Sequence, residues 1–183
     1  SARLHKKKDR PALFYKAAMK YLSYTPLQSL SKEEQANTAF DIGLASLVGE
    51  SLYVFGDLVQ HPIMESLVGT PRGWLKLLLE TFNAGDIEAY EALVAKNQKE
   101  LAGQPLLVQN IDRLKEKITI LALIELAFSR QGQGRSLPFK VIAEKTKLKN
   151  PELVERLVMK ALSLGLIRGR FDQVQQLVVV EWV

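Results

Sequence analysis

Residues 150–171 read NPELVERLVMKALSLGLIRGRF, and this stretch decides the fold of the C-terminal part of the chain. Asn150 is a favourable N-cap residue, and Pro151 suits the first position of a helix. The apolar residues that follow, beginning with Val154, recur every three or four positions, which is typical of a helix that buries one face. Gly165 predicts the end of this helix, and the β-rich run after it predicts a strand.

The pattern extends in both directions from this helix. A shorter amphipathic helix is predicted over residues 139–146, and a turn at Leu148 separates the two helices. Two β-rich runs, residues 167–171 and 176–183, are joined by a turn at residues 172–173. A helix, a turn, a helix and a hairpin within residues 136–183 are the layout of a winged helix.

The sequence before residue 131 is helical in its periodicity, with short connections between amphipathic segments. A capping box, Ser31 with Glu34, begins one of the helices. Short connections favour antiparallel helix pairs, as in helical-repeat solenoids, although no strict repeat period is present. We therefore expect a mostly α protein: an antiparallel helical-repeat array followed by a C-terminal winged helix with a small β-hairpin or sheet. The helices are predicted over residues 11–24, 32–48, 52–55, 62–68, 74–82, 87–94 and 106–130.

The predicted domain boundaries follow the changes in pattern. Residues 1–70 are expected to be N-terminal helical repeats, a fragment of a longer array. Residues 71–183 are expected to form a second domain, made of a helical bundle (71–135) and the winged helix (136–183). The polar, glycine-containing residues 131–136 predict the joint between these last two parts.

Composition excludes several classes of protein. The chain has no cysteine, so disulfides and thiolate metal sites are impossible, and we expect it in the cytoplasm and nucleus. No apolar run reaches the ~20 residues of a membrane-spanning helix, so no membrane contact is expected. Residues 1–10 carry +4 of the net charge of +5. This basic arm has little apolar content, and deletion of residues 1–10 is predicted to leave the fold and its melting temperature nearly unchanged.

No motif for catalysis, cofactor or metal was found. The two histidines, His5 and His61, lie in the basic arm and before Pro62, and no metal-binding spacing surrounds them. Glu125 is the one carboxylate within an apolar helical segment, and a position at a helix rim explains it better than catalysis. We predict no enzyme activity, no small-molecule substrate, no cofactor and no metal.

Nucleic-acid binding is the main alternative function, because winged helices often bind DNA. The second helix of the predicted winged helix carries Glu152 and Glu155 against Arg156 and Lys160, so its net charge is zero. Recognition helices present basic and amide side chains without neighbouring carboxylates. Residues 136–183 hold eight Lys/Arg and five Asp/Glu, so a small phosphate-binding patch stays possible on charge. Contact with protein is the favoured reading.

The predicted partner surface is the sheet of the winged helix. Val178, Val180 and Trp182 form one face of the last strand, and an open edge on this strand would allow a partner to pair with it. Arg168 and Arg170 on the preceding strand would supply a polar rim. The competing explanation is that Val178, Val180 and Trp182 are apolar because they pack inside the domain.

The order of these parts resembles the PCI family, whose members occur in the proteasome lid, the signalosome and a eukaryotic translation initiation factor. The segments that carry the resemblance are residues 14–18 (FYKAA), 43–50 (GLASLVGE), 55–58 (FGDL), 61–62 (HP), 65–67 (ESL) and 158–169 (VMKALSLGLIRG). The resemblance implies a non-catalytic scaffold subunit whose winged helix packs against other PCI-containing subunits. It favours the proteasome lid, and hence ubiquitin-dependent protein degradation, over the other two assemblies.

Overall fold

The computed structural model describes residues 9–130 and 135–182. The chain divides into two compact units, described separately below. The N-terminal unit consists of residues 1–83 and 88–115, and the C-terminal unit consists of residues 84–87 and 116–183. The predicted joint at 131–136 falls largely on residues outside the described ranges, as does the basic arm up to residue 8.

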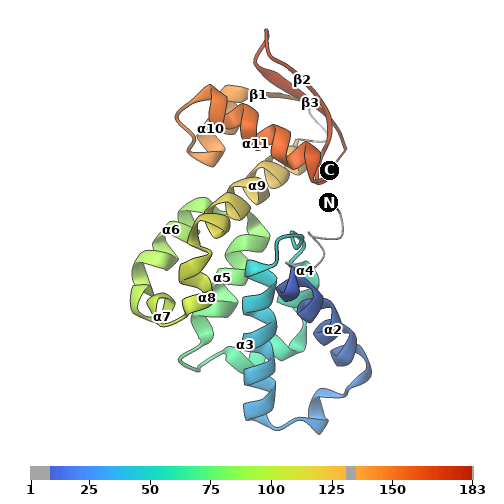
Figure 1. The fold of residues 1–183 in the computed structure, drawn as a ribbon, viewed down its shortest axis with the longest axis vertical. Helices are drawn as coiled ribbons and strands as arrows, with labels where there is room; N and C mark the ends of the chain where they lie inside the picture. The colour runs from blue at the N-terminus through green and yellow to red at the C-terminus, as the bar shows by residue number, and fades with distance from the viewer. Residues whose placement is uncertain (1–8, 131–134, 183) are drawn as a thin grey trace. The chain divides into compact units, whose positions relative to one another are not determined.

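The regular secondary structure among the described residues of the N-terminal unit is all helical (Figure 1). Helix α2 packs against α3, and α3 also packs against η2 and α8. The elements in chain order are α2 (Arg10–Tyr24), η1 (Leu27–Ser29), α3 (Lys32–Val48), α4 (Gly56–Gln60), η2 (Pro62–Leu67), α5 (Gly73–Ala84), α6 (Ile87–Lys96), α7 (Gln98–Ala102), α8 (Pro105–Gln109) and the first residues of α9 (Ile111–Ser129).

Local hydrogen bonds explain where α2 and α3 begin. At α3, Ser31 Oγ accepts from the backbone N–H of Glu34 at 3.2 Å, and Glu34 Oε2 accepts from the backbone N–H of Ser31 at 2.8 Å. The predicted capping box is thus confirmed. At α2, the carboxylate of Asp9 accepts from the backbone N–H of Ala12. Asp9 belongs to the basic arm, so this cap is a contact that deletion of residues 1–10 would remove.

Helices α3 and α5 approach closely because α3 carries a glycine where they meet. A Cβ atom at Gly43 would lie 2.8 Å from Leu75 Cδ2 and 3.2 Å from Leu79 Cδ1, so a side chain there would push the leucines away. Leu75 and Leu79 are both fully buried. The core continues through Phe82 of α5, whose ring meets Phe55 and Tyr90 at centroid distances of 5.8 and 5.6 Å. Close packing of this kind fixes the spacing of helices.

The C-terminal unit contains the rest of α9, β1 (Ser136–Pro138), α10 (Phe139–Thr146), α11 (Pro151–Ser163), β2 (Arg168–Asp172) and β3 (Leu177–Trp182). The strands form an antiparallel sheet in the order β1-β3-β2, and α10 packs on α11. Asn150 caps α11, because its Oδ1 accepts from the backbone N–H of Glu152 at 2.9 Å. Gly165, at φ +69°, follows the helix as predicted. The fold predicted from the sequence, helices followed by a winged helix, is confirmed.

Three local predictions were wrong. Residues 52–55 form no helix, and α4 begins at Gly56 instead. The helix predicted over residues 106–130 is broken at Asn110, which leaves the α region while its side-chain amide bonds to the carbonyl of Leu106 at 2.7 Å. The second half of α9 is apolar on nearly every side, a pattern that predicts burial all round, yet Phe128 is 61% exposed and Glu125 is exposed as well.

Candidate partner interface

The last strand of the chain lies in the middle of its sheet. Strand β3 pairs with β1 on one side and with β2 on the other. Val178 stands opposite Leu137 of β1 and Phe171 of β2. Val178 and Val180 are only 1% and 6% exposed. The predicted open edge on the final strand is therefore wrong, because the unpredicted strand β1 covers it.

The predicted site residues separate into a buried pair and an exposed pair. Val178 and Val180 belong to the core of the winged helix in the isolated chain. Trp182 pairs through its backbone with Arg168, and its side chain lies outside the described part of the structure. The side chains of Arg168 and Arg170 are 68% and 84% exposed. Among the predicted site residues whose side chains the structure describes, the two arginines are the ones accessible to a partner in this conformation.

In the described part of the chain, strand β2 pairs on one side only, so its other edge faces away from the sheet (Figure 1). Arg168 and Arg170 both approach Glu181 on β3, each with Nε 3.9 Å from a carboxylate oxygen. Exposed pairs at this distance contribute little stability. Charged side chains on an edge strand discourage pairing with strands of unrelated proteins, and they can form ion pairs with a partner of opposite charge.

Glycine is required between the two arginines. The pairing of β2 with β3 shifts register between Arg168 and Gly169. A Cβ atom at Gly169 would lie 2.1 Å from the carbonyl oxygen of Val179, far inside contact distance. The backbones of the two strands can approach only because this side chain is missing. The bulge and the glycine together set the direction in which the arginines project.

The turn between β2 and β3, the wing, is well defined and carries an apolar tip. Asp172 Oδ1 accepts from the backbone N–H groups of Val174 and Gln175 at 2.9 and 3.0 Å. Gln173 donates to the carboxylate of Glu155 and so ties the wing to α11. Val174 is 94% exposed at the tip. The sequence analysis missed it, because one valine in a polar turn leaves no periodic signal.

The outward face of α11 mixes charged and apolar side chains. Leu153 and Met159 are 42% and 51% exposed on this helix. Lys160 is engaged with Glu116, with 3.7 Å between its Nζ and the carboxylate. Large exposed apolar groups beside neutralised charges suit contact with protein rather than with phosphate.

The described residues hold neither a cluster of metal ligands nor a membrane-spanning helix, and His61 has a local structural role. No cluster of three or more His, Asp or Glu side chains that could hold a metal ion occurs there. His61 is used structurally, because its Nδ1 accepts from the backbone N–H of Ile63 at 3.2 Å and caps η2. His5 lies outside the described residues. No described helix combines the length and the apolar character needed to cross a bilayer.

Helical elements followed in the sequence by a winged helix are the layout that the PCI resemblance implied. Residues 94–182 match the family model described as PCI domain, and residues 1–79 match the one described as PSD13 N-terminal repeats. The chain belongs to the PCI-domain family, as the resemblance implied.

Several relatives are named as regulatory subunits of the 26S proteasome. The chain is 47% identical over 182 residues to 26S proteasome non-ATPase regulatory subunit 13 homolog B of Arabidopsis thaliana, covering 100% of this chain and 47% of that protein. It is 37% identical over 172 residues to the 26S proteasome regulatory subunit RPN9 of Saccharomyces cerevisiae, covering 93% and 42%. The segments quoted from the sequence point likewise to regulatory particle non-ATPase subunit nine. The chain spans about half the length of these curated relatives.

Proposed function

We propose that the chain is part of a non-catalytic scaffold subunit of the proteasome regulatory particle lid. In this role it contacts other PCI-containing subunits and supports ubiquitin-dependent protein degradation in the cytoplasm and nucleus. The observation that carries the proposal is the similarity, along nearly the whole chain, to proteins named as non-ATPase regulatory subunits of the 26S proteasome. The proposal of a role without catalysis rests on the absence of a catalytic motif in the sequence and on the names of these relatives.

The contact surface we propose is the accessible edge of β2 together with the wing. Arg168 and Arg170 would set the register of a neighbouring subunit, and Val174 would add an apolar contact at the end of the strand. An added strand would gain backbone hydrogen bonds along β2, and the arginines would select its charge. Val178 and Val180 would support this surface from within the sheet, and direct partner contact with either would require the sheet to open. Trp182 stays a predicted partner contact.

A second candidate is supported by a specific similarity. The chain is 30% identical over 154 residues to eukaryotic translation initiation factor 3 subunit M of Aspergillus terreus, covering 84% of this chain and 32% of that protein. A scaffold role in an initiation factor would use the same fold and the same kind of edge. The lower identity and the shorter match make it the weaker candidate.

Purification of the tagged full-length protein from cells separates the two candidates. Under the lid proposal, proteasome regulatory particle subunits should co-purify in fixed proportion and withstand moderate salt. Recovery of initiation factor subunits in their place would overturn it. A titration with DNA and RNA at several salt concentrations tests the winged helix for nucleic acid, and the proposal expects no saturable binding with a steep salt dependence.

We also propose the division of the chain into repeats (residues 1–70) and a PCI domain (71–183) with a bundle and a winged helix meeting at 135/136. Limited proteolysis should cut first near these two boundaries, because exposed connections between domains are cleaved before packed elements. First cleavage inside α3 or α5 would contradict this division.

A further inference from the structure

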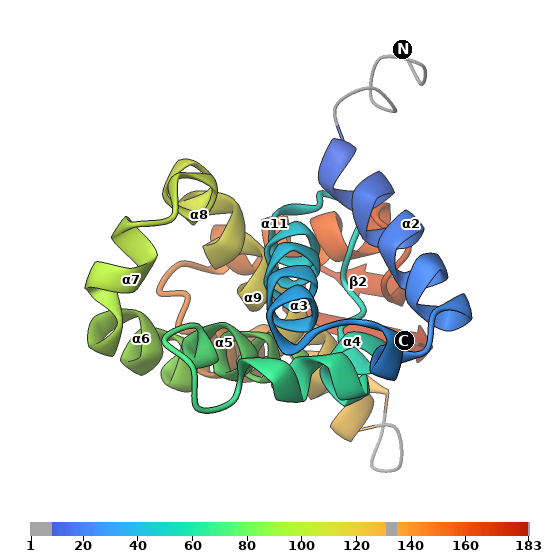
Figure 2. The ribbon, with the colours of Figure 1, turned by 90° about the horizontal axis from the view of Figure 1, so that it is seen from below.

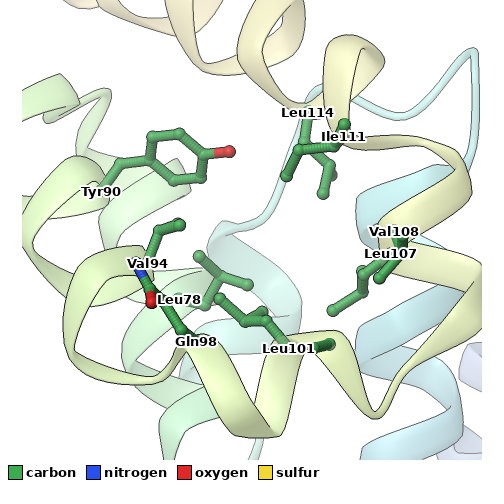
Figure 3. Close-up of a pocket in the computed structure, with 10 residues that line it drawn as sticks. Leu78, Tyr90, Val94, Gln98, Leu101, Leu107, Val108, Ile111 and Leu114 are labelled. Atoms are coloured by element: carbon green, nitrogen blue, oxygen red, sulfur yellow. The ribbon is translucent and has the colours of Figure 1, made fainter.

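An apolar cleft opens within the N-terminal unit, between α6 and α7 on one side and α8 and the start of α9 on the other (Figure 3). Its volume is about 220 Å³. Leu78, Leu107 and Leu114 are at most 2% exposed and line its interior. Val94 and Leu101 are partly exposed along its sides. Such a concave, mostly apolar surface is characteristic of small-molecule sites.

One buried polar atom faces this cleft. Tyr90 is 4% exposed, and its hydroxyl has no hydrogen-bond partner in the structure. Figure 3 shows the hydroxyl pointing into the cleft, from α6 toward Ile111 and Leu114. A buried hydroxyl without a partner is unfavourable, and buried polar groups are almost always satisfied. Phenylalanine would give the same packing against Phe82 without this penalty. The hydroxyl is thus oriented toward a group that the chain itself does not supply.

The protonation state of Tyr90 determines what that group can be. Burial raises the pKa of the Tyr90 hydroxyl above 10.0, and the negative charge of Glu91 raises it further. The hydroxyl therefore keeps its proton at neutral pH and can donate a hydrogen bond. The matching group is an acceptor such as a carbonyl, ether or hydroxyl oxygen. An anionic ligand is disfavoured by the apolar walls, which offer its charge no compensation.

The volume limits the size of the ligand. A cavity of ~150 Å³ lined by apolar side chains binds benzene. A cleft about one and a half times larger accepts a compact molecule of about nine non-hydrogen atoms. We propose that the cleft is a binding site for a neutral, compact, apolar molecule whose single acceptor oxygen receives the Tyr90 hydroxyl hydrogen bond. This site goes beyond the scaffold function, and the inference does not depend on the assembly in which the chain takes part.

Two probes of the same shape test the site. Acetophenone has a carbonyl oxygen, and α-methylstyrene replaces that oxygen with a methylene group at almost the same size. Ligand-observed NMR on the 183-residue chain should detect both. Tyr90→Phe should weaken acetophenone by about threefold to tenfold, the typical effect of one hydrogen bond, and should leave α-methylstyrene within about twofold. Tyr24→Phe, a change at a tyrosine that is 79% exposed in α2, is the matched control and should alter neither.

A blocking variant checks that the probes occupy this cleft. Ala102 lines the cleft and is exposed, so Ala102→Phe should fill the space with little disturbance of the fold and abolish binding of both probes. Val108→Trp, at another exposed lining position, serves if the first variant is not folded by circular dichroism. The proposal fails if neither probe binds the parent chain, if binding survives in the folded blocking variant, or if Tyr90→Phe weakens both probes equally.

Discussion

The carboxylate of Asp9 accepts a hydrogen bond from the hydroxyl of Ser51, with 2.7 Å between Oδ2 and Oγ, across 42 positions of the chain. The backbone N–H groups of Glu50 and Ser51 donate to the same carboxylate at 3.1 and 3.0 Å. Asp9 thus begins α2 and also holds the turn that follows α3. One side chain at the border of the basic arm joins two neighbouring helices of the array.

Replacing Asp9 by alanine should lower the free energy of unfolding by about 1–2 kcal/mol, because a helix cap and the hydrogen bonds to the 50–51 turn are lost together. Chemical denaturation of the 183-residue chain measures the change. Deletion of residues 1–8, which retains Asp9, is the control and should have little effect. Equal losses for the deletion and the substitution would show that stability resides elsewhere in the arm.

The same carboxylate should make stability depend on pH. Partial burial raises the pKa of Asp9, but the hydrogen bonds from Ser51, Glu50 and Ala12 together outweigh it and hold the pKa below 3.8. Its contribution is complete above the unfolded value near 3.8 and is lost as the pH falls through the lower folded value. In Asp9→Asn this part of the acid-induced loss should be missing from melting curves recorded between pH 5 and about pH 2.

Tyr90→Phe should stabilise the chain by about 1 kcal/mol, because it removes a buried hydroxyl that has no partner. The pKa of Tyr90 is raised by burial and then by Glu91, so the parent chain should also lose stability as the pH rises above 10.0, where the unfolded hydroxyl ionises first. The variant should lack that alkaline loss. Denaturation at pH 7 and pH 11 provides both measurements. A destabilised variant would mean that the hydroxyl is satisfied in solution.

Gly169→Ala should destabilise the winged helix by more than 2 kcal/mol, since the added carbon would meet the carbonyl oxygen of Val179. Gly165→Ala is the matched control, because Gly165 has a positive φ but no atoms within 4 Å of its Cβ position. The control should cost only about 1 kcal/mol, the strain of a left-handed residue. Hydrogen exchange along β2 and β3 should increase in the first variant only.

Reversing the charge of both arginines, Arg168→Glu with Arg170→Glu, should lower incorporation into the lid about tenfold or more, because a partner selected by positive charge would then be repelled. Both side chains are largely exposed, so the melting temperature should change little. The control is the same reversal at the exposed Lys140 and Lys149, outside the sheet. Equal incorporation of the two double variants, as measured by quantitative co-purification, would remove β2 from the proposed interface.

Capping residues in the sequence predicted the ends of helices well, whereas the sequence predicted poorly which strands pair with one another. Ser31 and Asn150 cap helices as expected, because capping depends on side chains a few residues away. Strand β1 was missed, since three residues ending at Pro138 are too few to show alternation. Whether β3 is central or at an edge depends on that short strand, so the alternation around Val178 could not decide it.

The cleft beside Tyr90 could not be predicted for a related reason. Tyr90 shares one side of its helix with Ile87 and Val94, and this apolar spacing predicts the burial that the structure shows. Whether its hydroxyl finds a hydrogen-bond partner depends on the distance between helices that are not adjacent in the chain. The residue pattern within one helix does not indicate that distance.

The dimensions of the cleft also depend on Gly43, a residue that does not line it. The missing side chain at Gly43 lets α3 lie close to Leu75 and Leu79 on α5, and the next face of α5 presents Leu78 to the cleft. Figure 2, seen from below, shows α3 next to α5 in the N-terminal unit. Helix α3, which does not line the cleft, therefore influences the depth of the cleft through its contact with α5. A substitution at Gly43 would change the volume of the cleft without changing any residue that lines it.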